Sequence, residues 1–272
     1  MKEKDIIKRV RFHGRGGQGM KTASRIVGTA AFMGGYYAQD FPVYGAERRG
    51  APIMAFTRLS DNPILERGII TCPDINIIAD ETLLDDNAAK VLQGMDNGTI
   101  TMVNTHYTPS HVKETYGVKG EVATVDITEI VLKIINKPAL SSVAAACACK
   151  LTGMISKDAL KEAVTRELTD IHLKRESIDK NIEAALVCFD NTPDISAAGS
   201  KHSKGYNGNR VVRLKYADPC VGTPSVYAMG NTIDKKTGNW RLYKPVIDYE
   251  ECSMCRACFV HCPHSCISID ES

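Results

Sequence analysis

Residues 8–32 read KRVRFHGRGGQGMKTASRIVGTAAF, and this stretch decides the fold class. Its first part alternates apolar side chains, such as Val10 and Phe12, with basic ones, which is typical of a β-strand. Glycines crowd residues 14–19, and the apolar residues of 20–32 then recur at helical spacing. A strand, a glycine loop and a helix in this order predict the start of an α/β domain.

The glycine loop contains Gly14, Gly16, Gly17 and Gly19, and Asp40 follows about twenty residues later, where dinucleotide-binding domains place a ribose-binding acid. Glycine lets the backbone approach a phosphate, and a helix N-terminus adds partial positive charge. The pattern therefore predicts a nicotinamide or flavin site. It is equally typical of a tight strand-to-helix turn, or of a loop that docks against a neighbouring subunit. The spacing does not separate these alternatives.

Strands and helices alternate through the rest of the first 190 residues. Further strands are predicted at residues 36–39, 53–59, 75–79, 99–103 and 121–127. Helices are predicted at residues 128–136, 141–151, 156–168 and 179–189, and a loop at 106–109. This alternation predicts an α/β fold with a mostly parallel sheet and helices on both of its faces.

The composition changes after residue 190. Residues 191–245 are rich in Gly, Asn, Ser, Lys and Pro and contain only brief apolar runs. A segment of this length without structure of its own is unusual inside a compact domain, so we expect an extended linker. The predicted organisation is therefore an α/β domain at 1–190, the linker at 191–245, and a small cysteine-rich module at 246–272.

Cysteines define the C-terminal module. Cys252, Cys255, Cys258 and Cys262 are spaced C-x2-C-x2-C-x3-C, and Pro263 follows directly. Bacterial-type ferredoxins have this run, in which three closely spaced thiolates bind one 4Fe-4S cluster. A zinc knuckle fits less well, because zinc sites usually separate two cysteine pairs by a longer interval. The run predicts a small ferredoxin-like 4Fe-4S module.

The role of Cys262 depends on residues beyond the run. In two-cluster ferredoxins the fourth cysteine binds the other cluster. No second cysteine triplet precedes Ser272, so we expect 246–272 to be the first half of an incomplete ferredoxin module. The alternative is a single cluster whose fourth ligand is Cys262 or Cys266. The cysteines elsewhere in the chain are interpreted as small buried thiols in a reducing compartment: Cys72, Cys147, Cys149, Cys188 and Cys220.

Charge and hydropathy exclude two classes of partner. The formal net charge is +2, with acids and bases scattered along the chain, so no basic stripe is present to neutralise nucleic-acid phosphates. No run approaches the roughly 18 apolar residues of a membrane helix, and no apolar signal core follows the N-terminus. We expect a cytoplasmic protein that binds neither nucleic acid nor membrane.

A second motif lies at residues 41–52, FPVYGAERRGAP. Arg48 and Arg49 in this motif predict bidentate binding of a carboxylate or a phosphate, or else salt bridges across a subunit interface. His13, His106 and His111 have no companion ligands at metal spacing, and no role is assigned to them.

A family resemblance rests on several of these motifs together. Residues 14–19 and 41–52, followed by Phe56-Thr57-Arg58, resemble the gamma subunit of the 2-oxoacid:ferredoxin oxidoreductases, the pyruvate type especially. This resemblance covers residues 8–190. The tail from about Val246 resembles the delta subunit, a two-cluster ferredoxin, of the same enzymes. A fusion of gamma and delta subunits would explain the predicted linker.

The resemblance implies a subunit of a thiamine diphosphate enzyme. In that family thiamine diphosphate and Mg²⁺ lie mainly between the alpha and beta subunits, which would be partners of this chain. The 2-oxoacid loses CO2 there, and electrons pass singly through 4Fe-4S clusters to an external ferredoxin. This chain would hold one cluster, or two if a missing half is present, and no catalytic residue. The glycine loop would have a structural or interface role, with coenzyme A as a weaker alternative.

Three alternatives remain open at the level of sequence. A gamma–delta fusion is compatible with pyruvate as substrate, and also with oxalate, which is cleaved to CO2 without coenzyme A. Outside the family, the chain would be a self-contained flavin- or NAD-binding iron-sulfur reductase whose glycine loop holds the dinucleotide. In a third interpretation the first domain is an interaction scaffold and the cluster is structural.

Overall fold

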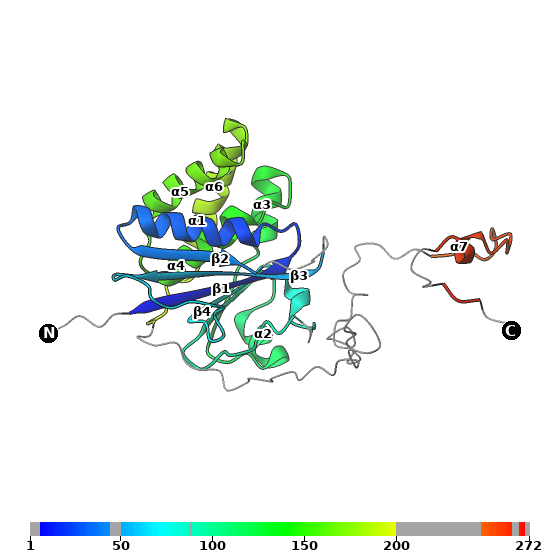
Figure 1. Cartoon of the computed structure of the whole chain (residues 1–272), viewed down its shortest axis with the longest axis horizontal. Helices are drawn as coiled ribbons and strands as arrows, with labels where there is room; N and C mark the ends of the chain where they lie inside the picture. The colour runs from blue at the N-terminus through cyan, green and yellow to red at the C-terminus, as the bar shows by residue number, and fades with distance from the viewer. Residues whose placement is uncertain (1–5, 44–49, 87–88, 200–245, 263–266, 270–272) are drawn as a thin grey trace, which may run out of the picture. The chain divides into compact units, whose positions relative to one another are not determined.

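The computed structural model describes residues 6–43, 50–86, 89–199, 246–262 and 267–269 (Figure 1). The chain divides into two compact units, Met1–Trp240 and Arg241–Ser272. Most of the predicted linker lies outside the described residues, so the linker stays a prediction.

A six-stranded sheet forms the centre of the first unit, with the strand order β2-β3-β1-β4-β5-β6. The strands are β1 Ile7–Arg15, β2 Tyr37–Pro42, β3 Pro52–Ser60, β4 Ile75–Ile78, β5 Ile100–Val103 and β6 Glu121–Thr124. The pairs β1-β4, β4-β5 and β5-β6 are parallel, whereas β3 runs antiparallel to both β1 and β2. The predicted α/β fold with a mostly parallel sheet is confirmed, and the sheet is mixed because β3 is reversed.

The reversal of β3 follows from the short connection between β2 and β3. Parallel neighbours need a crossover of about a dozen residues or more, usually a helix, whereas a short connection can join only antiparallel strands. Residues 43–51 are too few for such a crossover. Strand β3 therefore inserts beside β1 in the opposite direction and separates β2 from β1.

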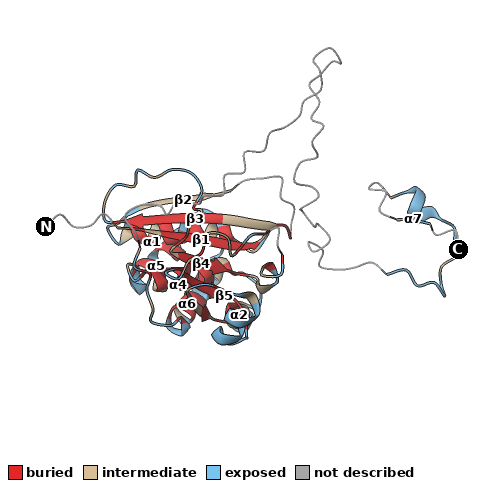
Figure 2. Cartoon of the chain, turned by 90° about the horizontal axis from the view of Figure 1, so that it is seen from below, coloured by how far each residue is buried: buried red, intermediate tan, exposed pale blue. Residues whose placement is uncertain are grey.

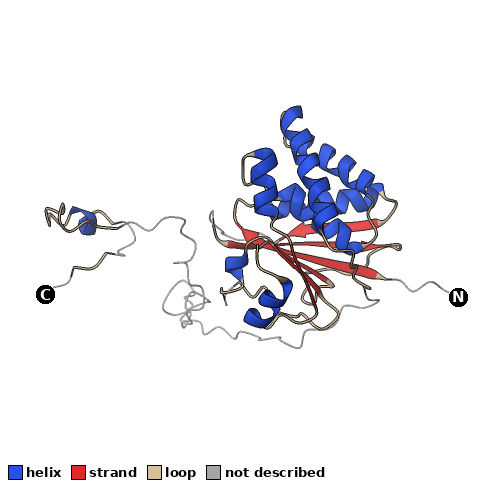
Figure 3. Ribbon diagram, turned by 180° about the vertical axis from the view of Figure 1, so that it is seen from behind, coloured by secondary structure: helices blue, strands red, loops and turns tan. Residues whose placement is uncertain are grey.

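Helices cover both faces of the sheet unequally (Figure 3). One face, here called the first face, carries α1 Met20–Met33, α3 Ile127–Ile135, α4 Ser141–Thr152, α5 Lys157–Asp170 and α6 Arg175–Asn191. The second face carries α2 Pro109–Tyr116 and the 3-10 turn η1 Glu81–Leu83. Each face has its own apolar cluster, because neighbouring strand residues point to opposite sides. The central strands are consequently buried along most of their length (Figure 2).

Every strand and helix predicted for the first 190 residues is present, with ends that differ by a few residues. Helix α2 was not predicted, and the loop predicted at 106–109 overlaps it only at Pro109. Its signals are Thr108, whose side chain caps the helix at His111 N, and Pro109 in the first turn. Val112 is the one buried residue of α2, so no apolar period reveals the helix.

Packing continues a few residues past position 190. Thr192 is buried, and the backbone N–H of Ala197 donates to the carbonyl of Leu151 in α4 at 3.0 Å. The α/β packing of the first unit therefore extends past residue 190, to at least Ala197.

The second unit is small. Its described residues include one short helix, α7 Ala257–Val260, and none of them is buried. Across all the ranges that the structure describes, no helix has the length and apolarity to cross a bilayer.

Candidate functional site

The glycine loop joins the carboxyl end of β1 to α1. Gly17 and Gly19 have φ values of 98° and 80°, a region that only glycine occupies without strain. A Cβ on Gly19 would lie 2.9 Å from the Cβ of Ser141, the first residue of α4. A Cβ on Gly14 would lie 2.6 Å from Cγ of Met20. The turn and its packing thus require these glycines whether or not a ligand binds.

The polar side chains of the loop are held by protein partners. Gln18 accepts from the backbone N–H of Arg15 at 2.7 Å and donates to Asp80 Oδ2 at 3.0 Å. Arg15 Nε lies 3.1 Å from Asp80 Oδ2, and Arg15 Nη2 donates to Thr82 Oγ1 at 2.6 Å. Its Nη1 donates to the carbonyl of Gly50 at 3.3 Å. Asp80 therefore balances the Arg15 charge, and the loop is braced by the turn between β4 and η1 and by Gly50, which precedes β3.

Asp40 lies away from this loop. It is paired with Thr57 of β3, and Thr57 in turn is paired with Val10 of β1. Strand β3 therefore separates Asp40 from β1, and Asp40 is level with the middle of β1 rather than with residues 14–19. Burial raises the pKa of the Asp40 carboxyl. This placement gives no support to Asp40 as a ribose-binding acid, and it favours the structural or interface role of the glycine loop.

The motif at residues 41–52, which contains Arg48 and Arg49, contacts β3 at one described end and the glycine loop at the other. Val43 N donates to the carbonyl of Met54 at 3.1 Å, and Gly50 N donates to the carbonyl of Gly16 at 3.1 Å. The C-terminal end of the motif is therefore bonded to the loop. Arg48 and Arg49 lie outside the described residues, so their predicted role is untested.

A row of aromatic rings lies after β5, at the same end of the sheet as the glycine loop. The ring centroid of Tyr107 is 4.2 Å from that of His106 and 4.5 Å from that of His111, and all three side chains are exposed. Sequence reasoning assigned the two histidines no role. Their position just after a predicted strand could have marked His106 and His111 as candidate site residues. Functional residues commonly lie at the carboxyl ends of parallel strands.

His13 is fully buried on β1, and its Nε2 has no hydrogen-bond partner within the described ranges. Burial lowers the pKa of His13 well below its ordinary value, and the charge of Arg11 lowers it further. The imidazole is therefore neutral at pH 7. The burial of His13 could not be predicted, because His13 belongs to an alternating run that resembles a half-exposed strand.

The four cysteines of the run are accessible. Cys255 and Cys258 are exposed, and Cys252 and Cys262 are half-buried. Met254 and Arg256 have φ values of 53° and 59°, so the backbone turns tightly between cysteines. The backbone N–H of Ala257 lowers the pKa of the Cys255 thiol, and the Ser253 side chain contributes.

Four thiols in residues 252–262 match a 4Fe-4S cluster in donor type and number. Within the described ranges, no three His, Cys, Asp or Glu side chains are grouped as metal ligands. The ligand assignment of Cys252, Cys255, Cys258 and Cys262 therefore rests on their spacing and stays a prediction.

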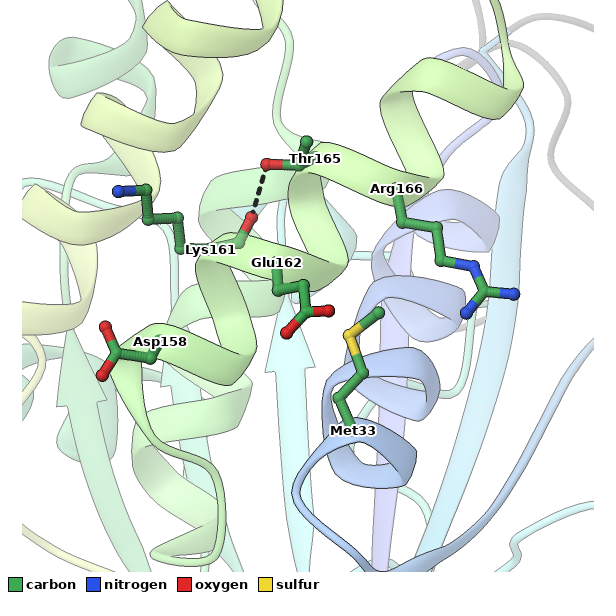
Figure 4. A pocket seen from close by; sticks show the side chains of 6 residues that line it. All are labelled: Met33, Asp158, Lys161, Glu162, Thr165 and Arg166. Atoms are coloured by element: carbon green, nitrogen blue, oxygen red, sulfur yellow. Dashed lines mark hydrogen bonds between the residues drawn. The ribbon is translucent and has the colours of Figure 1, made fainter.

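Three of the cysteines outside the run are buried in the first unit, and the first unit also has a surface hollow. Cys147, Cys149 and Cys188 are buried, as expected, whereas Cys72 is half-buried and Cys220 lies outside the described residues. A hollow of about 450 Å³ lies over α5 and the end of α1 (Figure 4) and is lined by Met33, Asp158, Lys161, Glu162, Thr165 and Arg166. It is at the end of α1 remote from the glycine loop, and its charged side chains point in different directions.

The first unit is thus an α/β domain whose glycine loop is braced internally, and a cysteine run follows it in the same chain. A family model described as pyruvate ferredoxin/flavodoxin oxidoreductase matches residues 9–190. The chain belongs to this family, and its first unit is a gamma-type subunit domain. The matched region ends before the cysteine run.

Named relatives agree with this assignment. The common gamma subunit of the pyruvate/ketoisovalerate oxidoreductases of Thermococcus kodakarensis is 39% identical over 184 residues, which cover 67% of this chain and 96% of the relative. The pyruvate synthase subunit PorC of Methanosarcina barkeri is 39% identical over 158 residues, 58% of this chain and 85% of the relative.

A solved structure supports the same fold. The crystal structure of the pyruvate oxidoreductase subunit PORC of Thermotoga maritima superimposes with a TM-score of 0.58 at 31% identity. The superposition covers 68% of this chain and 96% of that one. The resemblance inferred from residues 14–19 and 41–52 is therefore confirmed for the gamma-type domain.

Proposed function

We propose that this chain is a fused gamma/delta subunit of a thiamine diphosphate-dependent 2-oxoacid:ferredoxin oxidoreductase. The observation that carries the proposal is the presence, in one chain, of a gamma-type domain at residues 9–190 and the cysteine run of bacterial ferredoxins at 252–262. Both parts belong to the same class of enzyme. The expected partners are the alpha and beta subunits, which would hold thiamine diphosphate and Mg²⁺, and an external ferredoxin.

In this proposal the second unit transfers electrons. Cys252, Cys255 and Cys258 would bind three irons of a 4Fe-4S cluster, and Cys262 would bind its fourth iron or a second cluster. A bound 4Fe-4S cluster supplies one-electron transfer. The exposure of Cys255 and Cys258 supports this role, because electrons pass to another protein most readily from a site near the surface.

The first unit would contribute assembly rather than chemistry. The internal bracing of the glycine loop by Gln18, Arg15 and Asp80 supports a structural or interface role. Arg48 and Arg49 would form ion pairs with a neighbouring subunit. Coenzyme A at this loop is the weaker alternative, and it applies only if pyruvate is the substrate.

The substrate would be pyruvate, which undergoes oxidative decarboxylation, or oxalate, which is cleaved to CO2. The gamma-type relatives named for pyruvate support the first. A fusion of gamma and delta parts is also compatible with oxalate as the substrate. The substrate pocket is expected on the partner subunits.

The test is to purify the full chain anaerobically from its native host together with its associated proteins. Iron, sulfide and thiamine diphosphate are then assayed, and ferredoxin reduction is measured with pyruvate, with and without coenzyme A, and with oxalate. We expect thiamine-bearing subunits to co-purify, and one substrate to reduce ferredoxin. Purification of the chain alone, with bound flavin or nicotinamide, would instead establish the self-contained reductase.

A further inference from the structure

Two arginines are buried on the second face of the sheet, near the amino end of β1. The side chains of Arg9 and Arg58 are 2% and 3% exposed. Burying a charge is costly unless it is paired and hydrogen-bonded, so each arginine needs an anionic partner. Both arginines pair with Glu66, which lies in the segment after β3, and Arg9 is also 3.6 Å from Asp74.

The ion pairs hold the segment that contains Glu66. Arg9 Nε donates to Glu66 Oε2 at 2.9 Å, and Arg58 Nε lies 3.2 Å from the same oxygen. Hydrogen bonding from Arg9 is the largest cause of the lowered pKa of Glu66, so this carboxylate is ionised at neutral pH. Arg58 Nη2 also donates to the carbonyl of Gly68 at 2.7 Å. Two positions of the segment are therefore fixed to the sheet.

Hydrogen bonds from a side chain to the backbone within the segment restrict it further. Arg67 Nη1 donates at 2.8 Å to the carbonyls of both Ile64 and Glu66. Gly68 has a φ of 80°, which allows the chain to turn back at this point. Residues 65–69, here called the Leu65–Ile69 loop, are thus tied by hydrogen bonds and ion pairs on both sides of the turn.

The fixed loop exposes apolar side chains. Leu65 is 84% exposed and Ile69 is 58% exposed, on either side of Glu66 and Gly68. Single exposed aliphatic residues are common and need no explanation. Here, however, two of them are displayed by a loop that two buried arginines immobilise. Preorganisation of this kind lowers the entropy lost on binding, so it favours an intermolecular contact.

The charge of the loop indicates the chemistry of the partner. Glu66 is neutralised by the buried arginines, whereas Arg67 is exposed between the two apolar side chains. A complementary surface would therefore combine an apolar recess for Leu65 and Ile69 with a carboxylate beside Arg67. Apolar anchors surrounded by a polar rim are the usual anatomy of a protein interface.

We propose that the Leu65–Ile69 loop is a preformed docking element that inserts into an apolar, acid-rimmed recess on another subunit of the oxidoreductase complex. This inference rests on the proposed function, since it needs a complex in which the chain is a subunit. Arg9, Arg58 and Glu66 act as positioning residues, because they fix the loop and do not themselves contact the partner.

The test compares two double variants of the full chain, each co-expressed with the thiamine-bearing subunits. Leu65→Asp with Ile69→Asp places charge on both anchors. Leu132→Asp with Ile171→Asp is the matched control, because these side chains are also partly exposed, at 46% and 52%, and lie on α3 and at the end of α5. We expect the loop variant to lose affinity for the partner subunits by at least about tenfold, and the control to stay within about twofold of wild type.

Three outcomes would overturn the docking element. These are wild-type affinity in the loop variant, equal losses in both variants, and loss of self-association of this chain instead of loss of partner binding. Failure of the wild-type chain to bind any thiamine-bearing subunit would instead contradict the proposed function itself. Thermal unfolding of each variant establishes that it is folded.

A further variant tests the positioning role. Glu66→Gln keeps both apolar anchors and weakens their attachment to the sheet. We expect faster proteolysis of the Leu65–Ile69 loop and a smaller loss of partner affinity than in the double variant. An affinity loss without any change in loop proteolysis would show that Glu66 contacts the partner directly, and would contradict the positioning role.

Discussion

Three titratable side chains of β1 are buried in succession on the second face of the sheet: Arg9, Arg11 and His13. Arg9 has carboxylate partners, whereas Arg11 donates to Asn76 Oδ1 and to backbone carbonyls, those of Val91 and Gln93 among them. Burial lowers the pKa of Arg11 to about 10. It therefore remains charged at neutral pH. Burial lowers the pKa of His13 as well, and because the ordinary pKa of histidine is only 6.5, His13 is neutral at pH 7.

Buried His13 should make folding stability depend on pH. Its pKa in the folded state lies well below the ordinary value of 6.5. Below pH 6.5 the unfolded chain binds a proton that the folded chain cannot bind, so stability falls as the pH falls, by up to about 1.4 kcal/mol per pH unit. His13→Leu should remove this part of the slope. The measurement is the free energy of unfolding of wild type and variant between pH 7.5 and 5.5.

Exposed His111 provides the control for this comparison. His111→Leu is measured in parallel over the same pH range. If His13→Leu and wild type lose equal stability on acidification, then His13 gains its proton without opening the fold, and the interpretation of its burial is wrong.

At the scale of secondary-structure elements, the contact between α1 and α4 explains the glycine loop without a ligand. Gly19 has a positive φ and faces Ser141 at the start of α4. The two helices approach closely here because position 19 lacks a side chain. Dinucleotide-binding loops also use a glycine for close packing of their helix, so the same spacing arises from two different physical requirements.

Gly19→Ala should destabilise the first unit for two separable reasons. Backbone strain at a positive φ costs about 1 kcal/mol, and the clash with Ser141 adds a further cost. In a double-mutant cycle, adding Ser141→Gly should relieve the steric clash and leave the backbone strain at position 19. Denaturant unfolding of wild type, the two single variants and the double variant measures the cost of the clash and the cost of the strain. A coupling energy near zero would contradict the proposed close contact, and a change in nucleotide binding would reopen the dinucleotide interpretation.

The structure differs from the sequence prediction at two elements, the helix α2 and the strand β3. Residues 109–116 form α2, although they lack an apolar period, because Thr108 and Pro109 start the helix and Val112 anchors it. Strand β3 was located correctly, but its direction follows from the length of the connection to β2. For the strands and for the helices other than α2, element type was therefore predictable from side-chain periodicity, whereas strand direction and strand neighbours were not.

At the scale of the whole molecule, the separation into two compact units predicts that their stabilities are independent. Cys255→Ala should abolish the brown colour and most of the iron. The melting temperature of the first unit should not change, because the buried apolar side chains that the structure describes lie at positions 7–197. Iron content, visible absorption and thermal unfolding under anaerobic conditions measure both effects.

Half-buried Cys72 in the first unit supplies the matched control. Cys72→Ala should retain full iron content. Undiminished iron in the Cys255 variant would overturn the ligand assignment, and loss of the first unit's folding transition would contradict the independence of the two units.

The amino-acid sequence by itself determined the α/β class, nearly every helix and strand of the first unit, the gamma-type family and the ferredoxin spacing of the cysteines. These features depend on local periodicity and on short motifs, which are visible within a few residues. The roles of Asp40, Gln18 and Asp80 were decided only by the tertiary structure, because they depend on which strands become neighbours. The same is true of the buried cluster of Arg9, Arg58 and Glu66, since burial of a charge is set by what the distant chain places over it.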